Sequence, residues 1–135
     1  MIMDLKTSIQ NVWIFKSDDE AKLARDHIQK AVDEWIGTNC DKPFAVRDLF
    51  GGESAWDWQD MPLEPLWKNY REKGKTPDEA FDLAAKAAGK LLKKVLHEDK
   101  RKFRMHDGYV NSYSLVAEGE MGVNFMMRMK MSMWI

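Results

Sequence analysis

The feature that most constrains this chain is a sharp corner between two predicted helices, at residues 74–79. Gly74 ends the first helix, because glycine adopts the left-handed conformation that closes a helix at little cost. Thr76 and Glu79 have the spacing of a capping box, in which each side chain bonds to the backbone amide of the other residue. Pro77 takes the first helical position, where its missing N–H is tolerated. The corner predicts a helix pair over residues 62–98.

The second helix of this pair is the predicted centre of the core. Its apolar residues recur at helical spacing and form a broad stripe. They are Ala80, Phe81, Ala84, Ala87, Ala88, Leu91, Leu92, Val95 and Leu96. Ala84, Ala85, Ala87, Ala88 and Gly89 are small, so another element can approach the middle of this helix closely. We therefore expect it to be the central helix of the fold.

The first half of the chain predicts a strand and then a helix. Residues 9–16 alternate, with Val12 and Ile14 on one face and Trp13 and Phe15 on the other. Both faces are apolar, which is typical of a strand that is covered on two sides or meets a partner.

Ser17 and Glu20 form a second capping-box pattern, and Gly37 marks the expected end of the helix that follows. The segment Phe44–Phe50 fits either a short strand or a helical turn.

The C-terminal third changes from helical to alternating periodicity, which predicts a meander of three antiparallel strands. Asp107-Gly108 is a preferred hairpin dipeptide, and residues 118–122 form the second turn. In the last strand, Val123, Phe125, Met127, Met129, Met131 and Met133 share one face. We predict one α+β domain, residues 1–135, in which the N-terminal strand and the meander form an antiparallel sheet packed on about three helices.

Length and charge limit the functional classes. At 135 residues the chain predicts one domain. Its net charge of -1 shows that the chain as a whole is not a polyelectrolyte, so nucleic-acid binding would have to rest on local charge. The single cysteine, Cys40, cannot form an intramolecular disulfide, which fits a reducing compartment. We see no secretion signal and no apolar run long enough for a membrane span, so we expect a cytoplasmic protein without membrane contact.

Two sets of side chains predict a partner or ligand surface. Trp56 and Trp58 lie in an acidic loop, where they either fold back over the core, the interpretation that we favour, or form a docking site. The other set is Trp13 with the methionine-strand residues Phe125, Met127, Met129 and Met131. The methionine face suits dimerisation or an apolar ligand. Its M-x-M-x-M spacing also suits Cu(I), but no His or Cys lies in that strand, so we predict no metal.

A basic run supports an alternative function, nucleic-acid binding. The helix pair 62–98 and the hairpin 100–117 have the order of a winged helix-turn-helix. The residues available for phosphate contacts are Lys90, Lys93, Lys94, Lys100, Arg101, Lys102 and Arg104. Against this, the polar side chains of the second helix are lysines, and it lacks the Asn, Gln or Arg that read base edges. A solvated lysine face is the simpler interpretation.

Several short segments carry a resemblance. They are Val46-Arg47-Asp48-Leu49, Trp56-Asp57-Trp58, Pro62-Leu63, Tyr70, Gly74-Lys75, Ala80, Leu91-Leu92-Lys93 and Lys100-Arg101-Lys102-Phe103. Together they resemble small uncharacterised bacterial proteins encoded in mobile gene cassettes of integrons. The resemblance implies a compact bacterial protein and transfers no site residue.

Catalytic motifs are absent from the sequence. It has no phosphate loop, no Gly-x-Ser-x-Gly and no dinucleotide fingerprint, and its histidines, His27, His97 and His106, are scattered. We therefore predict a binding or protein-interaction module that self-associates, with no catalytic residue and no cofactor.

Overall fold

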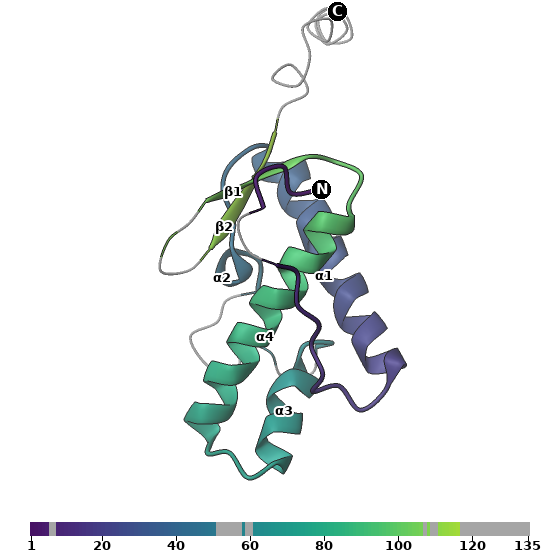
Figure 1. Ribbon diagram of the computed structural model, residues 1–135, viewed down its shortest axis with the longest axis vertical. Coiled ribbons are helices and arrows are strands. Elements are labelled where there is room, and N and C mark those ends of the chain that lie inside the picture. Colours follow the sequence, from purple (N-terminus) through teal and green to yellow (C-terminus); the bar gives the residue numbers. More distant parts are fainter. Residues whose placement is uncertain (6–7, 51–57, 59–60, 107, 109–110, 117–135) are drawn as a thin grey trace, which may run out of the picture.

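The computed structural model describes residues 1–5, 8–50, 58, 61–106, 108 and 111–116. Within these residues four helices combine with a two-stranded antiparallel sheet, as expected for an α+β protein. The elements are α1 (Asp18–Asn39), α2 (Val46–Phe50), α3 (Glu64–Glu72), α4 (Pro77–Glu98), β1 (Phe103–His106) and β2 (Ser112–Leu115). Figure 1 shows α4 running through the middle of the molecule, from α3 at one end to the hairpin at the other.

The predicted corner between α3 and α4 is confirmed. The hydroxyl of Thr76 accepts a hydrogen bond from the backbone N–H of Glu79 at 3.2 Å, and the Glu79 carboxylate accepts one from the N–H of Thr76 at 3.1 Å. Gly74 has a φ of +91°, which an L side chain rarely adopts. Helix α3 begins at Glu64 instead of the predicted Pro62, with Pro65 in its first turn. The corner folds α3 back against α4.

The expectation that the second helix is the centre of the core is confirmed. The buried residues of α4 are Ala80, Ala84, Ala87, Ala88, Leu91, Leu92, Lys93, Val95 and Leu96. Both α1 and α3 pack against it, α1 through Ala24, Ile28 and Val32. Small side chains in the middle of α4 allow these helices to approach closely.

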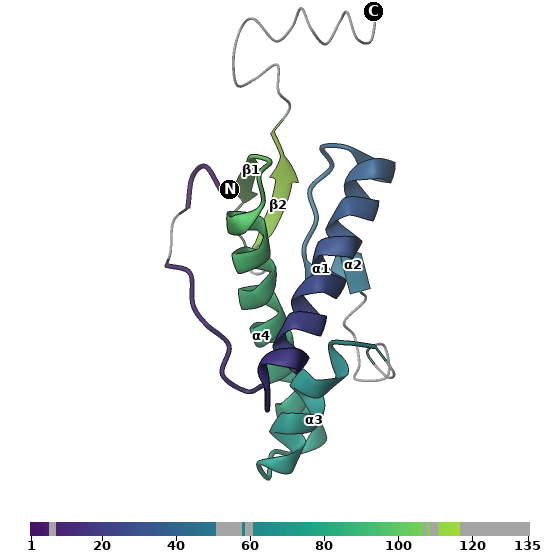
Figure 2. The same cartoon turned by 90° about the vertical axis from the view of Figure 1, so that its right-hand side faces the viewer.

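The predicted strand at residues 9–16 is wrong, because this segment is extended without pairing to a sheet. It runs along α4 from the hairpin end to the start of α1 (Figure 2). Side chains bond carbonyls of this part of the chain in place of a neighbouring strand: Asn69 donates to the Ile14 carbonyl at 3.0 Å, and Lys93 donates to the carbonyl of Ser8, just before the segment, at 3.1 Å. One side faces the core and the other solvent, since Ile14 is buried and Trp13 is 83% exposed.

The N-terminus still reaches the sheet, but through Ile2. This residue makes a single parallel bridge to Phe103 of β1. On the other edge Phe44 pairs with Tyr113 of β2 through two backbone hydrogen bonds of 2.8 Å. The segment Phe44–Phe50, predicted as a short strand or a helical turn, contains both: Phe44 bridges to a strand, and the residues from Val46 on form α2. The predicted third strand, residues 123–133, lies outside the described residues.

Helix α1 begins as predicted, after Ser17, but ends later than the predicted Gly37. The Ser17 hydroxyl accepts from the Glu20 N–H at 3.2 Å, but the Glu20 carboxylate accepts from the N–H of Lys16, so the capping box is only half formed. Gly37 does not end the helix. It continues to Asn39, and Cys40 turns the chain with a φ of 51° while its N–H donates to the Ile36 carbonyl.

We predict that Thr76→Ala lowers the free energy of unfolding by about 1 kcal/mol, the usual loss when a hydroxyl N-cap is removed. Urea unfolding followed by circular dichroism measures the change. Thr38→Ala is the control, because Thr38 is exposed in the last turn of α1 and no cap depends on it, so its effect should stay within about 0.5 kcal/mol. Equal losses in the two variants would contradict a special role for the corner.

Candidate binding groove along α4

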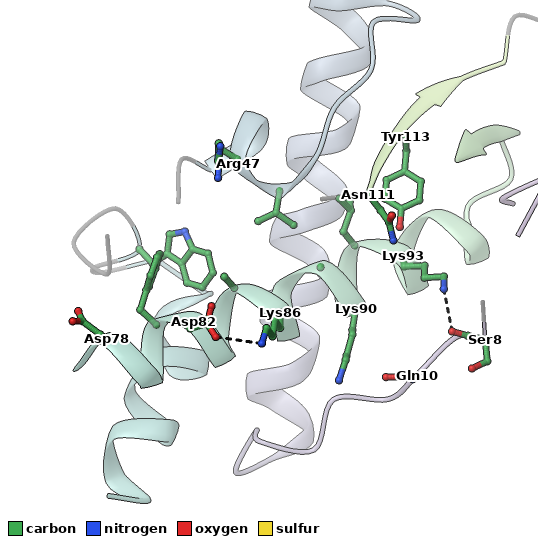
Figure 3. A pocket seen from close by; sticks show the side chains of 16 residues that line it. Ser8, Gln10, Arg47, Asp78, Asp82, Lys86, Lys90, Lys93, Asn111 and Tyr113 are labelled. Carbon is green, nitrogen blue, oxygen red and sulfur yellow. Dashed lines mark hydrogen bonds and ion pairs between the residues drawn. The ribbon is translucent and has the colours of Figure 1, made fainter. Parts of the chain in front are cut away.

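A groove of about 950 Å³ runs along one face of α4. Its other walls come from four segments that are distant in sequence. They are Ser8 and Gln10, Val46 and Arg47 of α2, Trp58, and Asn111 with Tyr113 at the hairpin. Figure 3 shows Arg47 and Asn111 on one side of α4, and Lys90, Gln10 and Ser8 on the other. The groove is therefore open along the helix and bounded on both sides.

The floor of the groove is apolar. Phe81, Ala85 and Gly89 follow one another at four-residue spacing on α4 and all line the cavity. The Trp58 side chain, which is completely buried, packs against the ring of Phe81 with the ring centroids 5.2 Å apart. Its indole Nε1 is buried and has no hydrogen-bond partner among the described residues. The floor therefore combines aromatic surface with a stretch that carries almost no side chain.

Gly89 is the residue that keeps this floor open. A glycine inside a helix costs roughly 1 kcal/mol relative to alanine, and proteins accept that cost where another segment comes too close for a side chain. Here a Cβ atom built at Gly89 meets nothing within 4 Å. Close packing within the described structure therefore does not account for this glycine, which leaves the floor of the groove low at this position.

The rims of the groove are charged, with more cations than acids. Arg47, Lys86, Lys90 and Lys93 are the cations, and Asp78 and Asp82 are the acids. Lys86 pairs with Asp82 at 3.3 Å, and the nearly buried Lys93 donates to the Ser8 carbonyl. Burial lowers the pKa of the Lys93 ammonium. Arg47 and Lys90 are exposed, and no hydrogen bond or ion pair within the described residues engages either.

A second, smaller groove of about 310 Å³ lies on the other side of Lys86 and Lys90. Its walls are residues 11–14, Tyr70 and Lys73, and the α4 residues Leu83, Lys86, Ala87 and Lys90. Lys86 and Lys90 thus form a ridge between the two grooves. The exposed Trp13 belongs to the second one, so an aromatic ring and several lysines share this face.

The structure uses part of the predicted nucleic-acid residues internally. Lys93 is nearly buried, Lys94 donates to the side chain of Asn11 at 3.3 Å, and Arg101 pairs with Asp33 and Asp99. Of the others, Lys90 lines both grooves. Lys100 and Arg104 are exposed and Lys102 is half-buried, and none of these three lines either groove. The basic run is therefore not one free cationic face.

Arg101 and Asp99 form a close ion pair just after the end of α4. Burial raises the pKa of the Asp99 carboxyl, but hydrogen bonds from the Arg101 side chain and backbone and from Gln29 outweigh it and hold that pKa at about 2. The carboxyl oxygens lie 2.7–3.0 Å from the guanidinium nitrogens. Arg101 also reaches Asp33 at 2.6 Å and so joins the end of α4 to α1.

The residues predicted to contact a partner differ in their exposure. Trp13 is exposed, as a docking residue requires, whereas Trp58 is buried in the wall of the groove. The favoured interpretation, that the loop tryptophans fold onto the core, is thus confirmed for Trp58. Trp56, Phe125, Met127, Met129 and Met131 lie outside the described residues. Sequence reasoning missed Arg47 and Phe81 as site residues, and the unexplained glycine in a long helix was the signal that marked the groove.

Comparisons with protein-family models, curated proteins and solved structures give no match. The resemblance to integron cassette proteins stays a prediction. In the part of the chain that the structure describes, no three His, Cys, Asp or Glu residues gather as metal ligands, and no helix has the length and apolar character to span a bilayer.

We predict that Asp99→Asn lowers the free energy of unfolding at pH 7 by about 2 kcal/mol, the linkage value of a pKa moved from 3.8 to about 2. The folded-state pKa is depressed, so this contribution is present above about pH 4 and is lost as the pH falls toward 2. Urea unfolding at a series of pH values measures it. Asp33→Asn is the control, because that side chain is 55% exposed and should matter by no more than about 1 kcal/mol. An unchanged pH profile in Asp99→Asn would contradict the assignment.

We also predict that Gly89→Ala raises the free energy of unfolding by about 0.5–1 kcal/mol, since the new methyl group gains helix propensity without a clash. Gly37→Ala is the matched case, because Gly37 also lies in a helix with open space around it. Thermal and urea unfolding of both variants test this. If Gly89→Ala alone destabilises the protein, a packing contact explains the glycine and the groove does not.

Proposed function

We propose that this protein is a binding module that holds its ligand or partner in the groove along α4. The observation that carries the proposal is Gly89, a helix-weakening residue that lines the floor of the groove and has no described neighbour within 4 Å of the place of a Cβ atom. Its neighbours in the groove support it: apolar Phe81 and Ala85 on the floor and the exposed cations Arg47 and Lys90 on the rims. Apolar clefts with a few placed polar groups are typical binding sites.

Nucleic-acid binding through the helix pair 62–98 and the hairpin 100–117 is the weaker alternative. At least four of its seven cations, Lys93, Lys94, Arg101 and Arg104, already interact within the protein. The acids Asp78 and Asp82 at one end of the groove would repel phosphates. Self-association, a cytoplasmic location and an origin in an integron cassette remain predictions from the sequence, and the first of these is tested by sedimentation at micromolar concentration.

A small anionic aromatic probe, anilinonaphthalene sulfonate, tests the groove. We expect one bound probe per chain with a rise in its fluorescence, because the sulfonate suits Arg47 and Lys90 and the rings suit the floor. Gly89→Phe places a benzyl group on the floor and should weaken probe binding by about tenfold or more, a loss of about 1.4 kcal/mol. Gly37→Phe adds the same group to α1, away from the groove, and should leave binding unchanged.

The near-ultraviolet circular dichroism and the unfolding midpoint of both variants establish that they are folded, since this probe also binds loosely packed states. Equal binding by Gly89→Phe and the unchanged protein would contradict the proposal. Absence of probe binding to the unchanged protein would contradict it as well.

A further inference from the structure

We infer that the occupant of the groove is an acidic amphipathic helix of a partner protein. This inference rests on the proposed function and names the chemistry of the partner. It draws on three properties of the groove: its length, the position of its free cations, and the uneven distribution of charge along it.

The length of the groove suits a polypeptide segment. Residues Asp78 and Lys93 of α4 both line it, and fifteen helical steps of 1.5 Å correspond to about 22 Å. A compact metabolite fills only part of such a length, whereas a helix of four turns matches it. A helix laid along α4 places side chains at spacings of three and four residues over Phe81, Ala85 and Gly89, where the low floor leaves room for them.

The free cations predict where the acids of the partner lie. Arg47, on α2, and Lys90, on α4, stand on opposite sides of the floor (Figure 3). A helix whose apolar stripe faces the floor carries its flanking residues toward both rims. Glutamate or aspartate on each flank of that stripe therefore meets one of the two cations. Both cations are exposed, and no hydrogen bond or ion pair with another described residue has to break for them to do so.

The groove also has a polarity. Asp78 and Asp82 lie toward the N-terminal end of α4, and Lys90 lies two turns beyond Asp82. Acids at the Asp78 end of the partner would be repelled. We therefore expect the acidic residues of the partner at the Lys90 end and neutral or basic residues at the Asp78 end.

The same features disfavour a single nucleic-acid strand in this groove. Such strands bind through aromatic faces on which bases stack and through cations that follow the backbone. The indole of Trp58 is completely buried and presents no free face, and two of the four groove cations already bond within the protein. An evenly charged strand also cannot avoid Asp78 and Asp82.

Fluorescence anisotropy with synthetic peptides tests the inference. The acidic peptide has about 16 residues, enough for a helix as long as the groove, with leucines on one stripe and glutamates on its flanks. One comparison peptide carries lysine in place of glutamate, and another has the acidic composition in an order without an apolar stripe. We expect the acidic amphipathic peptide to bind at least about tenfold tighter than either, with an affinity that falls as salt is raised.

Charge reversal on the protein sharpens the test. Arg47→Glu combined with Lys90→Glu should lower the affinity for the acidic peptide by about tenfold or more and raise the affinity for the lysine peptide. Lys30→Glu is the matched control, because this exposed lysine on α1 lines neither groove and its reversal should change neither affinity by more than about twofold.

The outcomes separate the inference from the proposed function. If the naphthalene probe binds in a Gly89-dependent manner but the acidic peptide shows no preference, the inference is overturned and the groove remains a binding site. If a single-stranded oligonucleotide of similar length binds more tightly and loses affinity in the double charge reversal, nucleic acid replaces the peptide as the partner. If neither probe nor peptide binds, both the inference and the proposed function fail.

Discussion

The packing of α4 determines the rest of this structure. The apolar stripe of α4 is wider than the surface that α1 and α3 cover. The helix is therefore buried on one side and still apolar on part of the other. Trp58 and α2 cover some of the remaining surface, and the N-terminal segment runs along another side. What is left is the half-buried row of Phe81, Ala85 and Gly89, with Trp58 packed against Phe81 at one end. The groove thus results from the same helix that holds the core together.

Local signals in the sequence identify the elements whose stability is local. The α3–α4 corner is predicted correctly because its capping bonds join residues only three positions apart. The antiparallel pairing of β1 with β2 is predicted correctly because an alternating pattern is also short-range. Residues 9–16 were misjudged because an extended segment held by Asn69 and Lys93 has the same alternating pattern as a strand in a sheet. Which group bonds a carbonyl depends on tertiary contacts that no short pattern records.

The candidate site is less predictable for the same reason. Its walls come from five parts of the chain, and only the α4 face is continuous in sequence. The small residues of α4 indicated a close approach of another element, which holds for Ala84 and Ala87 on the buried side. Gly89 is different, since no neighbour occupies the space where its side chain would be. Sequence alone cannot distinguish a glycine that admits a helix from one that leaves a cavity.

The cations show how local charge differs from available charge. Arg101 is tied to Asp99 and Asp33, and its charge therefore stabilises the join between α4 and α1 instead of attracting a ligand. Lys86 and Lys93 are engaged as well. Arg47 was not part of the basic run at all, yet it and Lys90 are the groove cations that bond to no other described residue. A chain with a net charge of -1 can thus present a cationic rim. Internal ion pairs neutralise some of its charges, and the charges that stay exposed are not evenly distributed over the surface.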